Sequence, residues 1–184
     1  MEFEEKTIKS KLIYDGKVTK YIVEDVLLPN GQQSKREIVR HGGAASVIAF
    51  TDDQKLLLVK QYRKAIEKVS IEIPAGIKDA EDEDGLNTAK RELEEETGFQ
   101  ARDWSFVTSF YSTPGFTDEF LEIYEAAQLI KVENPLPKDE DETIELLALT
   151  YEEAWKAYEE GHLRDSKSVF ALFYWKTKKI QEHK

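Results

Sequence analysis

Residues 91–99 read Arg-Glu-Leu-Glu-Glu-Glu-Thr-Gly-Phe, and this stretch decides both how the chain folds and what it can bind. On a helix, Glu92, Glu95 and Glu96 stand at positions i, i+3 and i+4 and therefore share one face. Carboxylates placed in this way repel one another by roughly 0.2–0.5 kcal/mol per pair in water. A cation such as Mg²⁺ or Mn²⁺ would reverse that sign, because hard cations take oxygen ligands. Composition alone leaves two interpretations open, a solvated acidic helix and a metal-binding face.

The neighbouring residues predict that a helix covers 84–97. Gly98 follows it directly, and glycine is the usual residue just beyond a helix C-terminus. Arg91 precedes Glu95 by one turn, so its guanidinium can hold that carboxylate in place. One stripe of the helix is expected to face the core, and it consists of Leu86, Ala89 or Lys90, Leu93 and Thr97.

The N-terminal part of the chain, residues 7–41, is typical of β-strands. Tyr21–Leu28 is rich in β-forming residues, Pro29-Asn30-Gly31 is a turn signal, and Ser34–Val39 can pair back as a hairpin arm. A unit of this size cannot bury a hydrophobic core alone. It must therefore pack on the rest of the chain or on a second copy.

After residue 42 the pattern changes to short apolar runs separated by turns, as in buried strands. Two helix patterns close the chain, and Thr150 is the expected N-cap of the first. The expected strands are 45–50, 56–59, 70–73, 104–110, 119–127 and 144–149, and the expected closing helices are 151–160 and 166–180.

The composition favours a soluble cytoplasmic protein with small-molecule partners. The 184 residues carry a net charge of −11, which disfavours nucleic acid and anionic membrane as partners. The chain has no cysteine, so disulfides, thiolate chemistry and cysteine-based zinc sites are excluded. No run of about 18 apolar residues is present, and the N-terminus lacks a signal-peptide pattern.

The string Arg-Glu-apolar-x-Glu-Glu-x-Gly-apolar at 91–99 resembles the signature helix of the Nudix hydrolases. In that family a Gly and a Glu precede the helix, and here Gly76 and Glu83 take those places. Six residues separate them instead of the usual five, so the loop carries one extra residue, or Asp82 stands in for the Glu. The resemblance implies an α/β fold: a Nudix α/β/α sandwich with a mixed sheet over 43–184, plus a small N-terminal antiparallel β-unit over 1–42.

Further segments resemble the ADP-ribose pyrophosphatases of this family, and this second resemblance implies roles for individual residues. The segments are Val39–Ala44, Gln61–Arg63, Glu72–Gly76 and Ser112–Glu119. By this resemblance the metal ligands are the Ala75 carbonyl and the carboxylates of Glu92, Glu95 and Glu96, with Glu95 also counted as catalytic. Substrate contacts fall to Arg63 for the phosphates or the adenine side, to Glu119 for the terminal ribose, and to Pro114 and Gly115. Without the resemblance, Arg63 and Glu119 are ordinary surface positions, and Pro114-Gly115 is a simple turn.

The acidic run at 138–145 has two interpretations as well. Runs of this kind are usually solvated loops. In ADP-ribose pyrophosphatases, however, a loop here closes over the site, and alignment with that group makes Glu140 the general base and Glu142 a supporting metal ligand. Four acids in a row, 139–142, leave the register open by a residue.

Together these resemblances imply metal-dependent hydrolysis of the pyrophosphate of ADP-ribose to AMP and ribose 5-phosphate, with more than one Mg²⁺ or Mn²⁺ ion. The alternatives are another NDP-sugar, a dinucleotide or an oxidised nucleotide as substrate, or a nucleotide-sensing module that does not cleave. The resemblance also implies a homodimer in which the N-terminal strands reach the partner's adenine pocket. Arg36 is the expected contact, because a guanidinium can stack on adenine or pair with phosphate.

Overall fold

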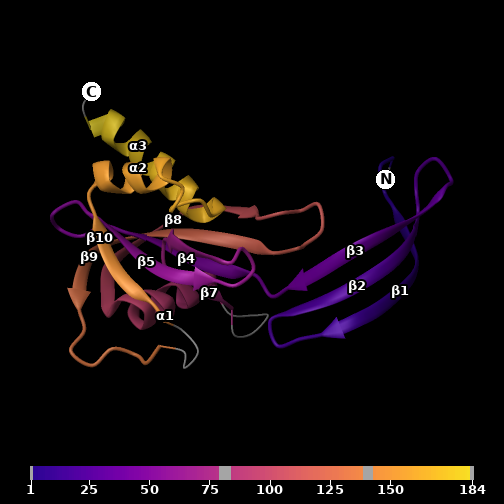
Figure 1. The fold of residues 1–184 in the computed structure, drawn as a ribbon, viewed down its shortest axis with the longest axis horizontal. Helices are drawn as coiled ribbons and strands as arrows, with labels where there is room; N and C mark the ends of the chain where they lie inside the picture. Colours follow the sequence, from indigo (N-terminus) through magenta and orange to yellow (C-terminus); the bar gives the residue numbers. More distant parts are fainter. Residues whose placement is uncertain (1, 79–83, 139–142, 183–184) are drawn as a thin grey trace.

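The computed structural model describes residues 2–78, 84–138 and 143–182, and within them the chain forms ten strands and three helices (Figure 1). The strands build three sheets, with the orders β1-β2-β3, β10-β5-β6 and β7-β4-β9-β8. The expected α/β class is confirmed. None of the helices in these ranges is long and apolar enough to cross a membrane.

The N-terminal sheet is an antiparallel meander that projects from the rest of the molecule (Figure 1). It consists of β1 (Lys6–Asp15), β2 (Thr19–Leu27) and β3 (Gln33–His41). The turn expected at Pro29-Asn30-Gly31 joins β2 to β3, with Leu27 opposite Gln33. Every residue of β1 is exposed, so this sheet has little core of its own. The division of the chain at residues 42 and 43 stays a prediction.

The central strands form one mixed and one antiparallel sheet. In the mixed sheet β4 runs parallel to β9 and antiparallel to β7, and β8 pairs with β9 antiparallel. In the other sheet β5 pairs antiparallel with both β10 and β6. Their bounds are β4 Ala44–Ala49, β5 Leu56–Arg63, β6 Lys68–Glu72, β7 Ala75–Ile77, β8 Phe99–Tyr111, β9 Phe120–Lys131 and β10 Glu145–Leu149.

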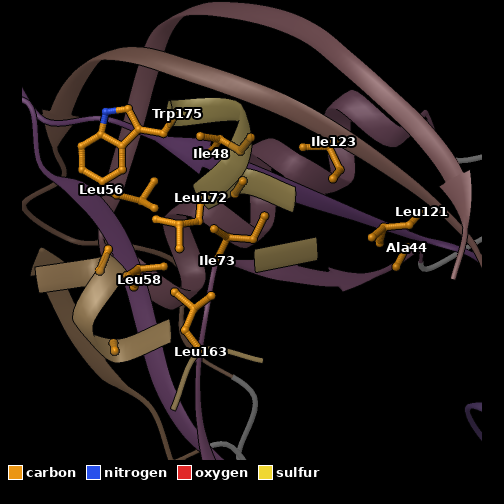
Figure 2. Packing of buried hydrophobic residues seen from close by; sticks show 13 residues of the cluster. Ala44, Ile48, Leu56, Leu58, Ile73, Leu121, Ile123, Leu163, Leu172 and Trp175 are labelled. Carbon is orange, nitrogen blue, oxygen red and sulfur yellow. The ribbon is translucent and has the colours of Figure 1, made fainter. Parts of the chain in front are cut away.

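The helices cover opposite faces of these sheets, which makes the α/β/α sandwich. Helix α1 (Gly85–Thr97) packs through Ala89 and Leu93 on one face, together with Val47 of β4. Helices α2 (Tyr151–Glu159) and α3 (Ser166–Glu182) lie on the other face. That second core, drawn in Figure 2, is formed around Ile48, Leu56, Leu58, Ile73, Leu163, Leu172 and Trp175. Since neighbouring residues of a strand point to opposite faces, β4 contributes to both cores.

The expected end of α1 at Thr97 and the expected starts of α2 and α3 are confirmed, whereas α1 begins one residue later, α2 ends one residue earlier and α3 ends two residues later than expected. Asp84 accepts a hydrogen bond from the Leu86 N–H at the start of α1, and Gly98 closes the helix with φ +73°. Thr150 and Glu153 form a capping box at the start of α2. Strand β8 begins at Phe99, five residues earlier than Trp104, where the sequence pattern put it, because it pairs with β9 as far as Lys131.

Candidate active site

The acidic face of α1 is turned toward the interior rather than toward solvent. Leu93 anchors the helix in the core and has no exposed surface. Of the three carboxylates, Glu92 and Glu96 are only 8% and 2% exposed, and Glu95 is half-buried. Because burying a carboxylate without compensation costs several kcal/mol, this face does not behave as an ordinary solvated acidic helix.

Strand β7 lies directly against this acidic face. The Ala75 N–H donates to Glu96 Oε2 at 3.0 Å. The backbone of β7 at Ala75, whose carbonyl the sequence named as a metal ligand, is therefore in direct contact with the acidic face. The next residue is Gly76, and a Cβ built on it would stand 1.8 Å from Glu92 Oε1, so any larger residue would require the Glu92 carboxylate to move. Gly76 therefore lets the backbone approach the helix as closely as the site requires.

Arg91 holds two of the carboxylates, as the sequence predicted for one of them. Its Nη1 donates to Glu92 Oε1 at 2.7 Å and to Glu95 Oε2 at 2.8 Å, and its Nη2 donates to the Ile77 carbonyl at 3.0 Å. One guanidinium thus links α1 to β7 and fixes the orientation of the acidic face.

The residues on this face fit a hard divalent cation by their chemistry, since they offer carboxylate and carbonyl oxygens in a half-buried setting. Within residues 2–78, 84–138 and 143–182, no three acidic or histidine side chains are gathered closely enough to enclose an ion. In this structure Arg91 and the Ala75 N–H bind carboxylate oxygens of the same face. The oxygen donors therefore stand on two adjoining elements, α1 and β7.

A cavity of about 590 Å³ is lined by β7, the strand that lies against this face, and we call it the main pocket. It brings together three residues that the sequence assigned to the site, Arg63 from β5, Ala75 from β7 and Glu119. The Ser112 hydroxyl donates to Glu119 Oε2, which holds that carboxylate in the wall. The start of α3 closes the other side with Arg164, Asp165, Ser166 and Lys167.

Sequence reasoning missed Glu72 and Lys167, which build the wall around Arg63. Arg63 donates from Nε to Glu72 Oε1 at 2.9 Å and from Nη2 to Oε2 at 2.7 Å, a bidentate pair. Lys167 adds a third donor to Glu72 Oε2 at 2.5 Å. Burial raises the pKa of the Glu72 carboxyl, but the Arg63 hydrogen bond and the Lys167 charge outweigh it and lower the pKa from 4.5 to about 2. Glu72 stood within a matched segment, but no spacing rule pointed to Lys167, 95 residues away.

Glu72→Gln is expected to destabilise the protein at pH 7 by roughly 2 kcal/mol, because it removes the buried carboxylate that pairs with the partly exposed Arg63 and with the buried Lys167, which keeps Asp165 as its second partner. Glu72 has a lowered pKa in the folded state, so its contribution is complete above the unfolded value of 4.5. That contribution is lost as the pH falls from 4.5 toward 2. Urea unfolding of both proteins at pH 7, 5, 4 and 3 measures this. A stability difference that stays constant across the series contradicts the assignment.

A second pocket, of about 400 Å³, holds the other substrate residues that the sequence singled out. Arg36 from β3 lines it opposite Pro114 and Gly115, so these three are brought together, but apart from Arg63 and Glu119. Arg36 is bound to Glu5 of its own chain. The Val39 N–H donates to the Phe116 carbonyl at 2.8 Å, which joins the N-terminal sheet to this loop.

The remaining candidates, Glu140 and Glu142, lie outside the described residues, as do Asp82 and Glu83 of the signature loop. The structure places the segment before the acidic run against α1. The Leu136 N–H donates to Glu94 Oε1 at 3.2 Å, and the Val132 N–H donates to the Gly98 carbonyl at 3.0 Å.

Comparison with known proteins places this site in context. Residues 40–172 match the family model for the NUDIX domain. The chain is 50% identical over 182 residues to the methanol dehydrogenase activator of Bacillus methanolicus, covering 99% of this chain and 98% of that protein. It is 47% identical over 171 residues to the ADP-ribose pyrophosphatase of Bacillus subtilis (strain 168), covering 93% and 92%. A crystal structure of an ADP compounds hydrolase superposes with a TM-score of 0.83 and covers 97% of this chain and 96% of that chain. The sequence identity is 21%, so this similarity shows the fold alone.

Proposed function

This chain belongs to the Nudix family and is a Nudix pyrophosphohydrolase, and from that premise we propose that it hydrolyses ADP-ribose to AMP and ribose 5-phosphate. The observation that supports this substrate is the main pocket, where Arg63 and Glu119 are brought together with β7, the strand that contacts the acidic face of α1. A guanidinium suits a pyrophosphate, and a carboxylate suits the hydroxyls of a ribose. Nearly full-length similarity to an ADP-ribose pyrophosphatase supports the same substrate.

Nudix hydrolases generally use divalent metal ions. We propose Mg²⁺ or Mn²⁺, more than one ion, held by the Ala75 carbonyl, Glu92, Glu95 and Glu96, with Glu142 in support. When bound, such ions polarise the P–O bond and lower the pKa of water. The choice of Mg²⁺ or Mn²⁺ rests on a donor set that consists of oxygen atoms only. The proposal of more than one ion rests on the family resemblance.

The chain's own residues then supply positioning and proton transfer. Arg63 holds the anionic pyrophosphate, and Glu119 orients the terminal ribose. Glu140 acts as the general base and removes the proton from the attacking water. Glu95, on the acidic face of α1, is both a metal ligand and a catalytic residue. Pro114 and Gly115 bind the adenine end, and in a homodimer Arg36 reaches the adenine pocket of the partner subunit, whereas within one chain it lines the second pocket beside Pro114 and Gly115. Arg91 holds the side chains of Glu92 and Glu95 in a fixed orientation through its hydrogen bonds to both carboxylates.

Product analysis tests this proposal. Purified protein is incubated with ADP-ribose, GDP-mannose, a dinucleotide and an oxidised nucleotide, each with Mg²⁺, with Mn²⁺ or with a chelator, and the products are separated by chromatography. We expect AMP and ribose 5-phosphate from ADP-ribose, no products with the chelator, and slower turnover of the other compounds. Faster turnover of another compound moves the substrate assignment to it, and nucleotide binding without cleavage favours a sensing module.

The N-terminal sheet supports the proposal of a homodimer. Its edge strand β1 exposes Ile8, Leu12 and Tyr14, and among the described strands it pairs only with β2. An exposed apolar edge strand invites association, which a second copy would satisfy. The opposite strand, β3, carries Arg36 into the second pocket, so a dimer through this sheet places substrate residues close to the interface.

Deletion of residues 2–41 is therefore expected to give a monomer whose KM for ADP-ribose is raised about tenfold or more, as the loss of one charge-assisted contact implies. Light scattering measures the mass, and steady-state kinetics measure KM. Circular dichroism has to show that the remaining domain is folded. A truncated protein that stays dimeric and keeps its KM contradicts the proposal. The cytoplasmic location and the absence of nucleic-acid and membrane partners stay predictions.

A second candidate function comes from the relative in Bacillus methanolicus, which is named as a methanol dehydrogenase activator and matches along nearly its whole length. We propose as the alternative that this chain activates an alcohol dehydrogenase. The test adds the protein to purified methanol dehydrogenase and measures the oxidation rate, with Glu96→Gln alongside. Stimulation by the wild type but not by the variant links activation to hydrolysis, and an unchanged rate with both removes the alternative.

A further inference from the structure

We propose that Lys167 is a positioning residue of this active site, which orients Arg63 through the buried carboxylate of Glu72. This inference rests on the proposed function, because it concerns the residue assigned to the substrate's pyrophosphate. It adds the C-terminal helix to a site for which the sequence named no residue beyond position 142.

The geometry of Arg63 shows why its orientation matters. A guanidinium has five N–H donors in a fixed plane. Two of its nitrogens, Nε and Nη2, are bound to the two oxygens of Glu72. The third nitrogen, Nη1, has no hydrogen bond to any residue within the described ranges. Since Arg63 lines the main pocket, the edge opposite Glu72 is the edge that can meet a substrate anion.

Glu72 links Lys167 to Arg63, because it is buried and accepts hydrogen bonds from both side chains. Its side chain is 3% exposed, so it cannot exchange its partners for water. Lys167 donates to the same oxygen, Oε2, that accepts from Arg63 Nη2. The carboxylate's charge is therefore shared between two cations, and Arg63 keeps part of its positive charge available to the pocket.

Lys167 is itself held in place by the first turn of α3. Its side chain is 12% exposed, and the ammonium also donates to Asp165 Oδ2 at 2.9 Å. Asp165 in turn accepts from the Ser168 N–H at 3.2 Å. Ser168 Oγ, fully buried, accepts from the Ile73 N–H at 2.8 Å. The start of α3 is thus bound to the segment that connects Glu72 with Ala75. These contacts fix the position of Arg63 and also that of the Ala75 carbonyl, the proposed metal ligand.

Removing the Lys167 charge changes this balance. Glu72 is then neutralised by Arg63 alone, which draws the guanidinium toward the carboxylate and reduces its attraction for the substrate. The effect falls on substrate binding, because the groups that act on the reacting water stand on α1 and on the acidic run. A rise in KM with a nearly unchanged kcat is the expected signature of such a loss.

The kinetic test compares Lys167→Met and Lys167→Arg with Lys176→Met, which removes an exposed lysine from the same helix. We expect Lys167→Met to raise KM for ADP-ribose about tenfold, the loss of one charge-assisted contact, with kcat within about threefold. Lys167→Arg is expected to restore most of the affinity, and Lys176→Met to behave as wild type. In an Arg63→Ala background, Lys167→Met is expected to have no further effect on KM. An equal rise in both backgrounds, or a lowered Tm with unchanged KM, overturns the proposal.

A second measurement keeps this inference separate from the identity of the substrate. Nitrogen-15 NMR reports the Arg63 Nε–H, assigned by its absence in Arg63→Lys, and its exchange with water. In the wild type we expect a protected signal, and in Lys167→Met a shifted one, with no substrate present. A wild-type protein that leaves ADP-ribose intact contradicts the proposed function, while the shift still supports the positioning role. An Arg63 signal that is the same in both proteins contradicts the positioning role whatever the substrate is.

Discussion

Glu96→Gln is expected to lower kcat for ADP-ribose by about a hundredfold or more while the protein stays folded. Glu96 is 2% exposed and accepts the Ala75 N–H, which a glutamine oxygen can still do. The substitution therefore keeps the shape and the hydrogen bond and removes one charge from the acidic face. Without metal, the free energy of unfolding should be unchanged or slightly higher, because mutual repulsion of the carboxylates is reduced.

The matched control is Glu152→Gln, the same change at an acid of α2 whose side chain is 76% exposed. It should leave both kcat and stability as in the wild type. Activity is measured over a range of Mg²⁺ concentrations, so that weakened metal binding is separated from a lost catalytic group. Wild-type rates for Glu96→Gln at every concentration contradict the assignment of a metal face to α1.

Gly76→Ala is expected to have the second largest effect, a loss of about ten- to a hundredfold in kcat, as when a residue that orients a metal ligand is changed. The added Cβ would stand 1.8 Å from Glu92 Oε1 and 2.0 Å from its Cδ, so one of the two has to move. The carboxylate is the softer partner, but Arg91 holds it at 2.7 Å. Displacement of Glu92 then also disturbs the link from Arg91 to Glu95.

Gly42→Ala is the control for a methyl group added in the same region. Its Cβ would have no neighbour closer than 4.0 Å, and its backbone does not adopt a positive φ. It should be nearly silent in both activity and Tm. For Gly76→Ala, Tm and the metal dependence of kcat are measured together. A variant with unchanged kcat would mean that Glu92 can leave its place without consequence, and would remove it from the ligand set.

The local features of this chain followed from the sequence because they depend on residues within one or two turns of each other. The face shared by Glu92, Glu95 and Glu96 follows from 3.6 residues per turn. The same holds for the Arg91–Glu95 pair at 2.8 Å and for the capping residues Thr150 and Gly98. Hairpin β2–β3 was predictable from its turn, since turn residues set the register of the strands that they join.

Which of the site residues share a cavity could not be predicted from the sequence. The family resemblance assigned Arg63, Glu119, Pro114 and Arg36 to one substrate, but it could not say which of them share a cavity. The structure puts Arg63 and Glu119 in the main pocket, and Pro114 and Arg36 in the second. These residues stand on elements that meet only when the sheets and loops are packed, and no period along the chain encodes that meeting.

By itself, then, the sequence determined the helix with its acidic face, the β2–β3 hairpin, the caps at Thr150 and Gly98 and, through its motifs, the family. Tertiary structure alone decided that this face is buried against β7, that Gly76 lies where a Cβ would displace the Glu92 carboxylate, and that Lys167 reaches Glu72 from 95 residues away. The physical reason is the range of the interactions. Helix and turn geometry act over a few residues, whereas burial and ion pairing act between side chains that the fold brings together from anywhere in the chain.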